Sequence, residues 1–243
     1  MWRAKLTEPD QVARLQSVRE RFDLYPLAIH ANYLINLASA DPVIRPRSIA
    51  AFRGELDRAA TIGAEYVVLH PGSYRGRSPE EGIASIAAGL RAAIKGFRSR
   101  HPKILIENTA GSGCNLGSTF EELQSIRLQA SLPIGFCLDT CHLLAAGFDI
   151  STQLGLRRTL RQADELLDLD NVELIHTNDS KTPLGSHVDR HENIGEGHIG
   201  IDGFRRILQH PKLRMKPFIL ETPVDEDGDD RRNLDLLKSL SRR

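Results

Sequence analysis

The chain has 243 residues, and its 32 Lys and Arg residues balance its 32 Asp and Glu residues. With 40% hydrophobic and 26% charged residues, the composition excludes a disordered chain, and no apolar run is long enough to span a bilayer. The balanced charge also excludes a strongly basic nucleic-acid coat protein. Because the N-terminus lacks the basic-then-apolar layout of a secretory signal, we expect a cytoplasmic protein without a membrane partner.

Short apolar or β-branched runs alternate with longer amphipathic runs along the chain. Helices are predicted over Gln11–Phe22, from Pro79 after a Ser78 cap, and over Glu122–Leu128 after a Ser118-Thr-Phe-Glu121 capping box. The predicted strands are Pro26–His30, Tyr66–His70, Lys103–Glu107, Ile134–Asp139, Val172–His176 and Pro217–Glu221. The alternation predicts repeated βα units.

The continuous apolar character of these strands indicates a parallel sheet that is covered on both faces. No linker interrupts the repeats, so we expect one domain over residues 1–243. We predict an α/β fold of the TIM type, a (β/α) barrel, with a doubly wound open sheet as the alternative. A complete barrel has about eight strands, so the prediction is a barrel that lacks two of them.

Each predicted strand finishes in a side chain that can bind a metal. In parallel α/β folds the carboxyl ends of the strands form the functional face, so these side chains should converge. Crowded carboxylates and imidazoles repel one another or lose solvation unless cations hold them. The six residues are His30, His70, Glu107, Asp139, His176 and Glu221.

Three further residues predict another ligand set. His142 follows Asp139 by three residues, where we expect the start of a loop, and Asp189 and His191 can face the same way in an extended segment. Mixed imidazole and carboxylate ligands favour Zn²⁺, with Mn²⁺ as an alternative, in a hydrolytic role. The three cysteines contain no C-x-x-C pair and are predicted to be reduced thiols in the core or in loops.

Seven sequence blocks in a fixed order resemble one known family. They are Ile29-His-Ala-Asn-Tyr-Leu-Ile-Asn-Leu37, Leu69-His-Pro-Gly-Ser73, Ile106-Glu-Asn-Thr-Ala-Gly111, Leu138-Asp-Thr-Cys-His142, Ile175-His-Thr-Asn-Asp179, Val188-Asp-Arg-His-Glu-Asn-Ile-Gly-Glu-Gly197 and Leu220-Glu-Thr222. The chain closely resembles endonuclease IV, the zinc-dependent apurinic/apyrimidinic endonuclease family of base-excision repair.

The resemblance implies three zinc ions. His30, His70 and Glu107 would bind the first ion, and His142, Asp189 and His191 the third. The second ion would be bound by Glu107, Asp139, His176 and Glu221, with Glu107 bridging the first two ions.

The resemblance also implies the reaction, which is hydrolysis of the phosphodiester bond 5′ to an abasic site in double-stranded DNA. The products would be a 3′-hydroxyl and a 5′-deoxyribose phosphate, formed by a zinc-activated hydroxide. The catalytic residues would be Glu107, Asp139 and Glu221. Tyr33, Leu34, Lys181 and Arg190 are candidate DNA contacts, and we expect a monomer.

Two other functions remain open from the sequence. One is a metal-dependent sugar isomerase or epimerase of the related barrel type, and the other is a zinc-bound DNA-damage binding module that does not cleave. Full-length family members begin with a strand, a helix and a strand ahead of the segment that here is Trp2-Arg3. The resemblance therefore implies an N-terminally shortened chain.

Overall fold

The computed structural model describes residues 8–97 and 102–242, so Trp2 and Arg3 lie outside the described residues. Its contacts divide the chain into two compact units. Unit 1 comprises Met1–Ile106 with Ser125–Gly135, and unit 2 comprises Glu107–Gln124 with Phe136–Arg243. The single domain expected over residues 1–243 stays a prediction.

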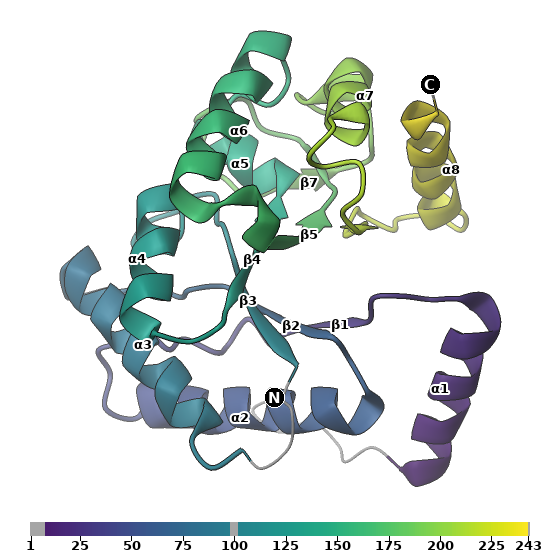
Figure 1. The fold of residues 1–243 in the computed structure, drawn as a ribbon. Helices are drawn as coiled ribbons and strands as arrows, with labels where there is room; N and C mark the ends of the chain where they lie inside the picture. The colour runs from purple at the N-terminus through teal and green to yellow at the C-terminus, as the bar shows by residue number, and fades with distance from the viewer. Residues whose placement is uncertain (1–7, 98–101, 243) are drawn as a thin grey trace. The chain divides into compact units, whose positions relative to one another are not determined.

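Unit 1 is built on parallel strands in the order β1-β2-β3, with helices packed against them (Figure 1). The helix α2 contacts both β1 and β2, and α3 and α1 contact α2. The elements of this unit are α1 (Pro9–Phe22), β1 (Ala28–His30), α2 (Ile44–Ile62), β2 (Tyr66–Leu69), α3 (Pro79–Ile94) and β3 (Lys103–Glu107). The helix α4 (Phe120–Ala130) begins in unit 2 and ends in unit 1.

The helix α3 begins at Pro79 as predicted, whereas α1 and α4 each begin two residues before the predicted Gln11 and Glu122. Ser78 accepts a hydrogen bond from the backbone of Glu81 and forms the predicted capping box at α3. The Ser118–Glu121 capping box predicted at α4 is wrong by one residue. Thr119 accepts instead from the Glu122 N–H, and the Glu122 carboxylate accepts from the backbone N–H of Ser118.

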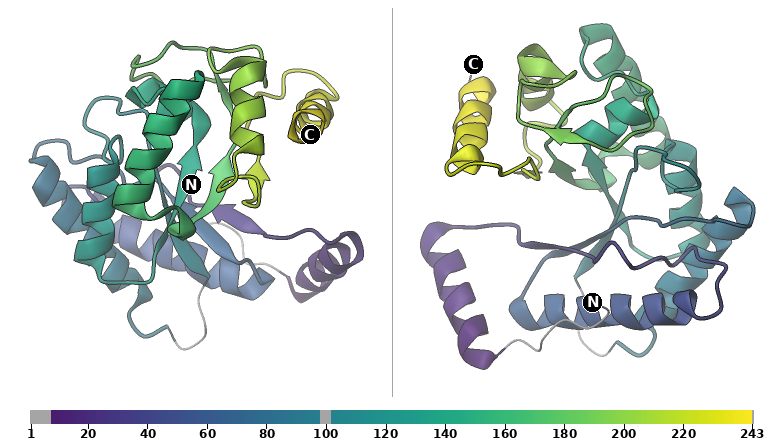
Figure 2. Two further views of the ribbon diagram at one scale, coloured as in Figure 1. Left: turned by 45° about the horizontal axis from the view of Figure 1, so that its top comes forward. Right: turned by 180° about the vertical axis from the view of Figure 1, so that it is seen from behind.

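Unit 2 has a second parallel ladder, in which β5 lies between β4 and β8. The α8 helix packs beside α7, as both views of Figure 2 show. The elements are β4 (Gly135–Asp139), α5 (Thr140–Ala146), α6 (Gln153–Leu167), the 3-10 turn Leu169–Asn171, β5 (Val172–His176), β6 (Asp179–Ser180), β7 (His191–Glu192), α7 (Gly200–Gln209), β8 (Phe218–Ile219) and α8 (Asp229–Ser241).

The predicted strands are confirmed, with shorter ends. All five residues of β4 are buried, as expected for a strand covered on both faces. β1 starts at Ala28, and β8 ends at Ile219, two residues before Glu221. The antiparallel pair of β6 and β7 was not predicted, because two-residue strands leave no period in the sequence.

No helix in the described ranges is long and apolar enough to cross a membrane. The cytoplasmic location stays a prediction.

Candidate metal centre

Two predicted ligands lie together in unit 1. His30 ends β1 and His70 follows β2, and their rings meet edge to face with centroids 5.1 Å apart. The neighbouring Tyr33 is 87% exposed, so its ring does not contribute to the core, while Leu34 is half-buried. The parallel pairing of β1 with β2 brings the two histidines to the same edge.

His176 lies between two carboxylates in unit 2. Its Nδ1 atom is 2.9 Å from Oε1 of Glu107 and 3.1 Å from Oε2 of Glu221. The register of β4 and β5 pairs His176 with Asp139, so both strands end at the same level. Glu107, Asp139 and His176 are buried, and Glu221 is partly exposed. The ligands predicted for the second zinc ion therefore lie together.

His142 lies in a helix, and the loop predicted at this position is wrong. Asp139 is the N-cap of α5, because its Oδ1 atom accepts a hydrogen bond of 2.8 Å from the His142 backbone N–H. The cap places His142 on the first turn of α5 with its side chain buried. Its Nδ1 atom lies 3.6 Å from Glu107 and 3.8 Å from Asp139, so His142 joins the same cluster.

The third predicted ligand set is also assembled. Nε2 of His142 lies 3.1 Å from Oδ2 of Asp189, and Nε2 of His191 lies 3.3 Å from Oδ1 of Asp189. Donor atoms about 2.0–2.1 Å from a tetrahedral zinc ion lie about 3.3–3.4 Å from one another. The separations in this set are close to that spacing.

Hydrogen bonds fix which nitrogen of each ring is available. Nδ1 of His142 is 2.9 Å from the carbonyl oxygen of Asn108, and Nδ1 of His191 is 3.0 Å from that of Glu221. A carbonyl oxygen only accepts, so in the neutral rings Nδ1 carries the proton and Nε2 presents a lone pair toward Asp189. Nε2 of His191 is buried and has no hydrogen-bond partner among the described residues. A cation at this position would satisfy the nitrogens and the carboxylate together, so the residues fit a metal.

The electrostatics of the cluster also favour a cation. Burial alone would lower the pKa of His142, but the carboxylates of Asp139, Asp189 and Glu107 raise it to about 10. Burial likewise opposes protonation of His176, and the nearby Glu107 carboxylate raises the pKa of His176 above its ordinary value. Without a metal, the carboxylates hold protons on these rings instead.

Two cysteines lie near the ligands. Cys137 is within metal-binding reach of Glu107 and His176, and Cys141 of Asp139 and His191. Burial raises the pKa of both thiols to about 12, so both stay protonated. All three cysteines are free, as predicted.

Sequence reasoning missed the polar residues behind the ligands. The buried carboxylate of Asp179 accepts hydrogen bonds from the backbone N–H groups of Ser180, Gly195, Gly197, Ile199 and Gly200. These bonds fasten the segment that follows His191. The side chains of Asn108 and Asn178 contact Asp139. In the sequence, the signal for these residues is that they follow the strand-end residues Glu107 and His176 by one to three positions.

Two candidate DNA contacts flank the third ligand set. Nζ of Lys181 lies 3.8 Å from Oε2 of Glu192, and the exposed Arg190 side chain donates to the carbonyl oxygen of Asp189. Both roles stay predictions.

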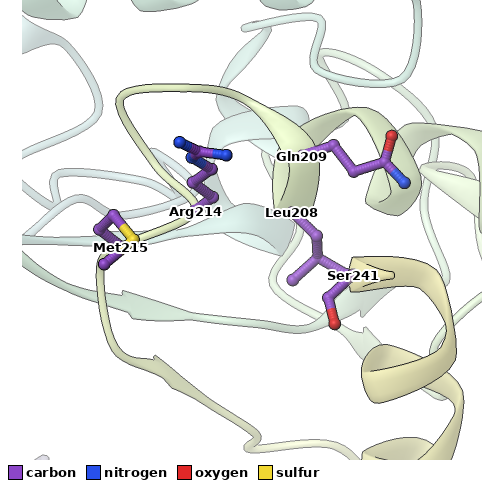
Figure 3. A pocket seen from close by; sticks show the side chains of 5 residues that line it. All are labelled: Leu208, Gln209, Arg214, Met215 and Ser241. Carbon is purple, nitrogen blue, oxygen red and sulfur yellow. The ribbon is translucent and has the colours of Figure 1, made fainter. Parts of the chain in front are cut away.

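A hollow elsewhere in unit 2 carries none of the predicted ligands (Figure 3). It lies where α7 ends, beside the last turn of α8. Its lining residues are Leu208, Gln209, Arg214, Met215 and Ser241.

Comparison with known proteins defines the class to which this fold and site belong. Residues 2–240 match the family described as xylose isomerase-like TIM barrel, so the chain is a member of that class. The barrel prediction is thereby confirmed over the open-sheet alternative.

Individual relatives define the family further. The chain is 66% identical to a probable endonuclease 4 of Solibacter usitatus, over 99% of this chain and 84% of the relative. It is 41% identical to a probable endonuclease 4 of Chloroflexus aurantiacus, over 98% of this chain and 85% of that relative. The crystal structure of endonuclease IV from Thermus thermophilus matches with a TM-score of 0.87 at 37% identity, covering 99% of this chain and 84% of that one. The chain belongs to the endonuclease IV family.

Proposed function

We propose that the protein is a zinc-dependent DNA-repair endonuclease that hydrolyses the phosphodiester bond 5′ to abasic sites in double-stranded DNA. The products would be a 3′-hydroxyl and a 5′-deoxyribose phosphate. Membership of the endonuclease IV family supports the class of enzyme, a hydrolase that cuts DNA at apurinic sites. The observation that carries the proposal is the third ligand set, His142, Asp189 and His191, with donor atoms 3.1 and 3.3 Å apart.

Two of the three proposed ligand sets consist of residues of unit 2. Glu107, Asp139, His176 and Glu221 are proposed as one set, and His142, Asp189 and His191 as the other. We also propose His30 and His70 as ligands, for which their close approach in unit 1 is the support. Three zinc ions per chain are proposed, with Mn²⁺ as an alternative at some sites.

When bound, the zinc ions would supply Lewis acidity, which acidifies water and offsets charge on the phosphate. The chain's own residues would orient the water and the phosphate. Glu107 is buried with Oε1 between Nδ1 of His176 and Nδ1 of His142, so this carboxylate oxygen is placed to hold a proton during the reaction. Asp139 and Glu221 are proposed as the other catalytic carboxylates.

Four residues are proposed to contact the DNA. Tyr33 offers an exposed ring that can stack on a base, and Leu34 follows it in the same turn. Arg190 places positive charge beside Asp189, and Lys181 places it beside Glu192, the residue after His191, where a phosphate would approach. The active form is proposed to be a monomer.

Incision of a duplex with one abasic analogue tests the proposal. Purified protein should cut the damaged strand 5′ to the analogue, should stop after chelation, and should recover with Zn²⁺. The same duplex without the analogue is the control substrate. A folded, zinc-loaded protein that binds the abasic duplex without cutting it would instead be a damage-binding module. Metal-dependent turnover of a ketose without incision would identify an isomerase.

A further inference from the structure

Asn178 joins two predicted metal ligands through its side-chain amide. Its Nδ2 atom donates a hydrogen bond of 2.6 Å to Oδ2 of Asp139. Its Oδ1 atom accepts a hydrogen bond of 2.8 Å from the backbone N–H of Glu221. Asn178 is fully buried, so water does not compete for these bonds.

The orientation of the amide is fixed. Oδ1 faces an N–H group, which can only donate, and Nδ2 faces a carboxylate, which only accepts. A flipped amide would place its oxygen against the Asp139 carboxylate. The backbone of Asn178 is also held, because Thr140 Oγ1 accepts from its N–H at 2.9 Å and donates to its carbonyl oxygen at 2.7 Å.

These contacts determine how Asp139 presents its oxygens. Oδ1 accepts from the His142 backbone N–H at 2.8 Å, and Oδ2 accepts from Asn178. Each carboxylate oxygen therefore has one hydrogen bond and retains a lone pair for a cation. Rotation of the carboxylate would break both hydrogen bonds.

We propose that Asn178 is a positioning residue that sets the rotation of the Asp139 carboxylate and the placement of Glu221 in the metal centre. It acts through these ligands and contacts neither substrate nor metal. The inference rests on the proposed metal centre but not on the identity of the DNA substrate. Partners behind metal ligands typically change metal affinity by about 10–100-fold when they are removed.

Two variants separate positioning from a merely structural role. Asn178→Ala removes both hydrogen bonds, and Asn178→Asp keeps an acceptor for the Glu221 N–H but removes the donor to Asp139. Asn171→Asp is the matched control, because Asn171 precedes the opposite end of β5, about 16 Å of strand from His176. Thermal unfolding of the metal-free proteins identifies variants that fail to fold.

The readouts are the visible absorption of bound Co²⁺ and Zn²⁺ affinity by chelator competition. We expect Asn178→Ala to bind at least one Zn²⁺ about 10–100-fold more weakly. We expect both Asn178 variants to shift the Co²⁺ band, while Asn171→Asp keeps the wild-type spectrum. Wild-type Co²⁺ spectra in the Asn178 variants would overturn the inference. If Asn178→Asp does not fold, the spectrum and affinity of Asn178→Ala decide.

The outcomes for this inference and for the proposed function are distinguishable. If the wild-type protein binds metal but does not cut abasic DNA, the proposed function is wrong, and the Asn178 spectra still decide the inference. If it cuts DNA and the variants bind metal as the wild type does, only the inference is wrong. A folded wild-type protein that binds no metal contradicts both.

Discussion

Nε2 of His142 lies 3.1 Å from Oδ2 of Asp189, although one residue is on the first turn of α5 and the other lies two residues before β7. Nδ1 of the same ring is 2.9 Å from the carbonyl oxygen of Asn108, which directs the lone pair of Nε2 toward Asp189. A neutral ring in this orientation meets the carboxylate with two acceptors, so the pair requires either a proton or a metal ion between them.

Removing this ring should therefore remove a metal ion. We expect His142→Ala to lose about one zinc equivalent per chain and at least about 100-fold in incision rate, since outer partners of ligands alone cost about 10–100-fold. Metal counting on the purified protein and the incision assay are the measurements. His210→Ala is the matched control, because His210 follows α7 and belongs to none of the three proposed ligand sets. If His142→Ala keeps the zinc content of the wild-type protein, His142 is not a zinc ligand.

The metal-free protein should lose stability as the pH rises. The nearby carboxylates outweigh burial and raise the pKa of folded His142 to about 10, above its ordinary value of 6.5. A group whose pKa is raised by folding contributes stability that is complete below its unfolded pKa and lost as pH rises through its folded pKa. The loss is expected between about pH 6.5 and 10. Urea denaturation with a chelator present measures it, and His142→Gln should flatten the profile.

Zinc affinity should change in the opposite sense. The ligand nitrogens must be deprotonated to bind a metal, so zinc competes with protons and binds more tightly as pH rises. Chelator competition at pH 6 and pH 8 measures the zinc affinity, which should be higher at pH 8 if these residues bind the metal. An affinity that does not depend on pH would contradict the assignment of His142 and His176 as ligands.

The buried carboxylate of Asp179 should be essential for the segment after His191. Asp179→Asn keeps the shape but replaces one acceptor oxygen with an NH₂ group, which would face at least two of the backbone N–H groups that the carboxylate now accepts. Each buried N–H left unsatisfied costs about 1–3 kcal/mol, so unfolding should require at least about 2 kcal/mol less. Urea denaturation gives this value. Limited proteolysis should cut between residues 193 and 200 first.

Gly197 should not tolerate a side chain, because Ser180 and Asp179 lie too close to it. A Cβ atom there would lie 2.4 Å from the carbonyl oxygen of Ser180 and 2.5 Å from Oδ1 of Asp179. We expect Gly197→Ala to destabilise the fold and to weaken zinc binding by moving His191. Gly54→Ala is the matched control, because a Cβ atom on this α2 residue would lie 3.6 Å from the flexible Arg58 side chain, which is an ordinary contact distance. The control should gain up to about 1 kcal/mol in thermal or urea denaturation.

The sequence allowed the strands and the six candidate ligands at their ends to be predicted, because each of these residues ends or closely follows a largely apolar run. The sequence predicts a loop at His142, because the helix α5 is short and its N-cap, Asp139, is also the last residue of a strand. Asn178 and Asp179 were missed because their side chains bond groups distant in the sequence, such as Asp139 and Gly197. Contacts of this kind follow from the folded path of the chain and leave no local pattern.

A substitution of Lys181 tests whether this residue of unit 2 contacts a DNA phosphate. Its side chain is 46% exposed and lies 3.8 Å from the Glu192 carboxylate, so little of its charge is neutralised. If it contacts a phosphate, Lys181→Ala should weaken binding of abasic duplex and of undamaged duplex by similar factors. It should also reduce the slope of log affinity against log salt by about 1. Fluorescence anisotropy over a salt series measures both. Lys238→Ala, an exposed lysine of α8, is the matched control and should leave the slope unchanged. If Lys181→Ala keeps the wild-type salt slope, Lys181 does not contact a phosphate, and its role is the ion pair with Glu192.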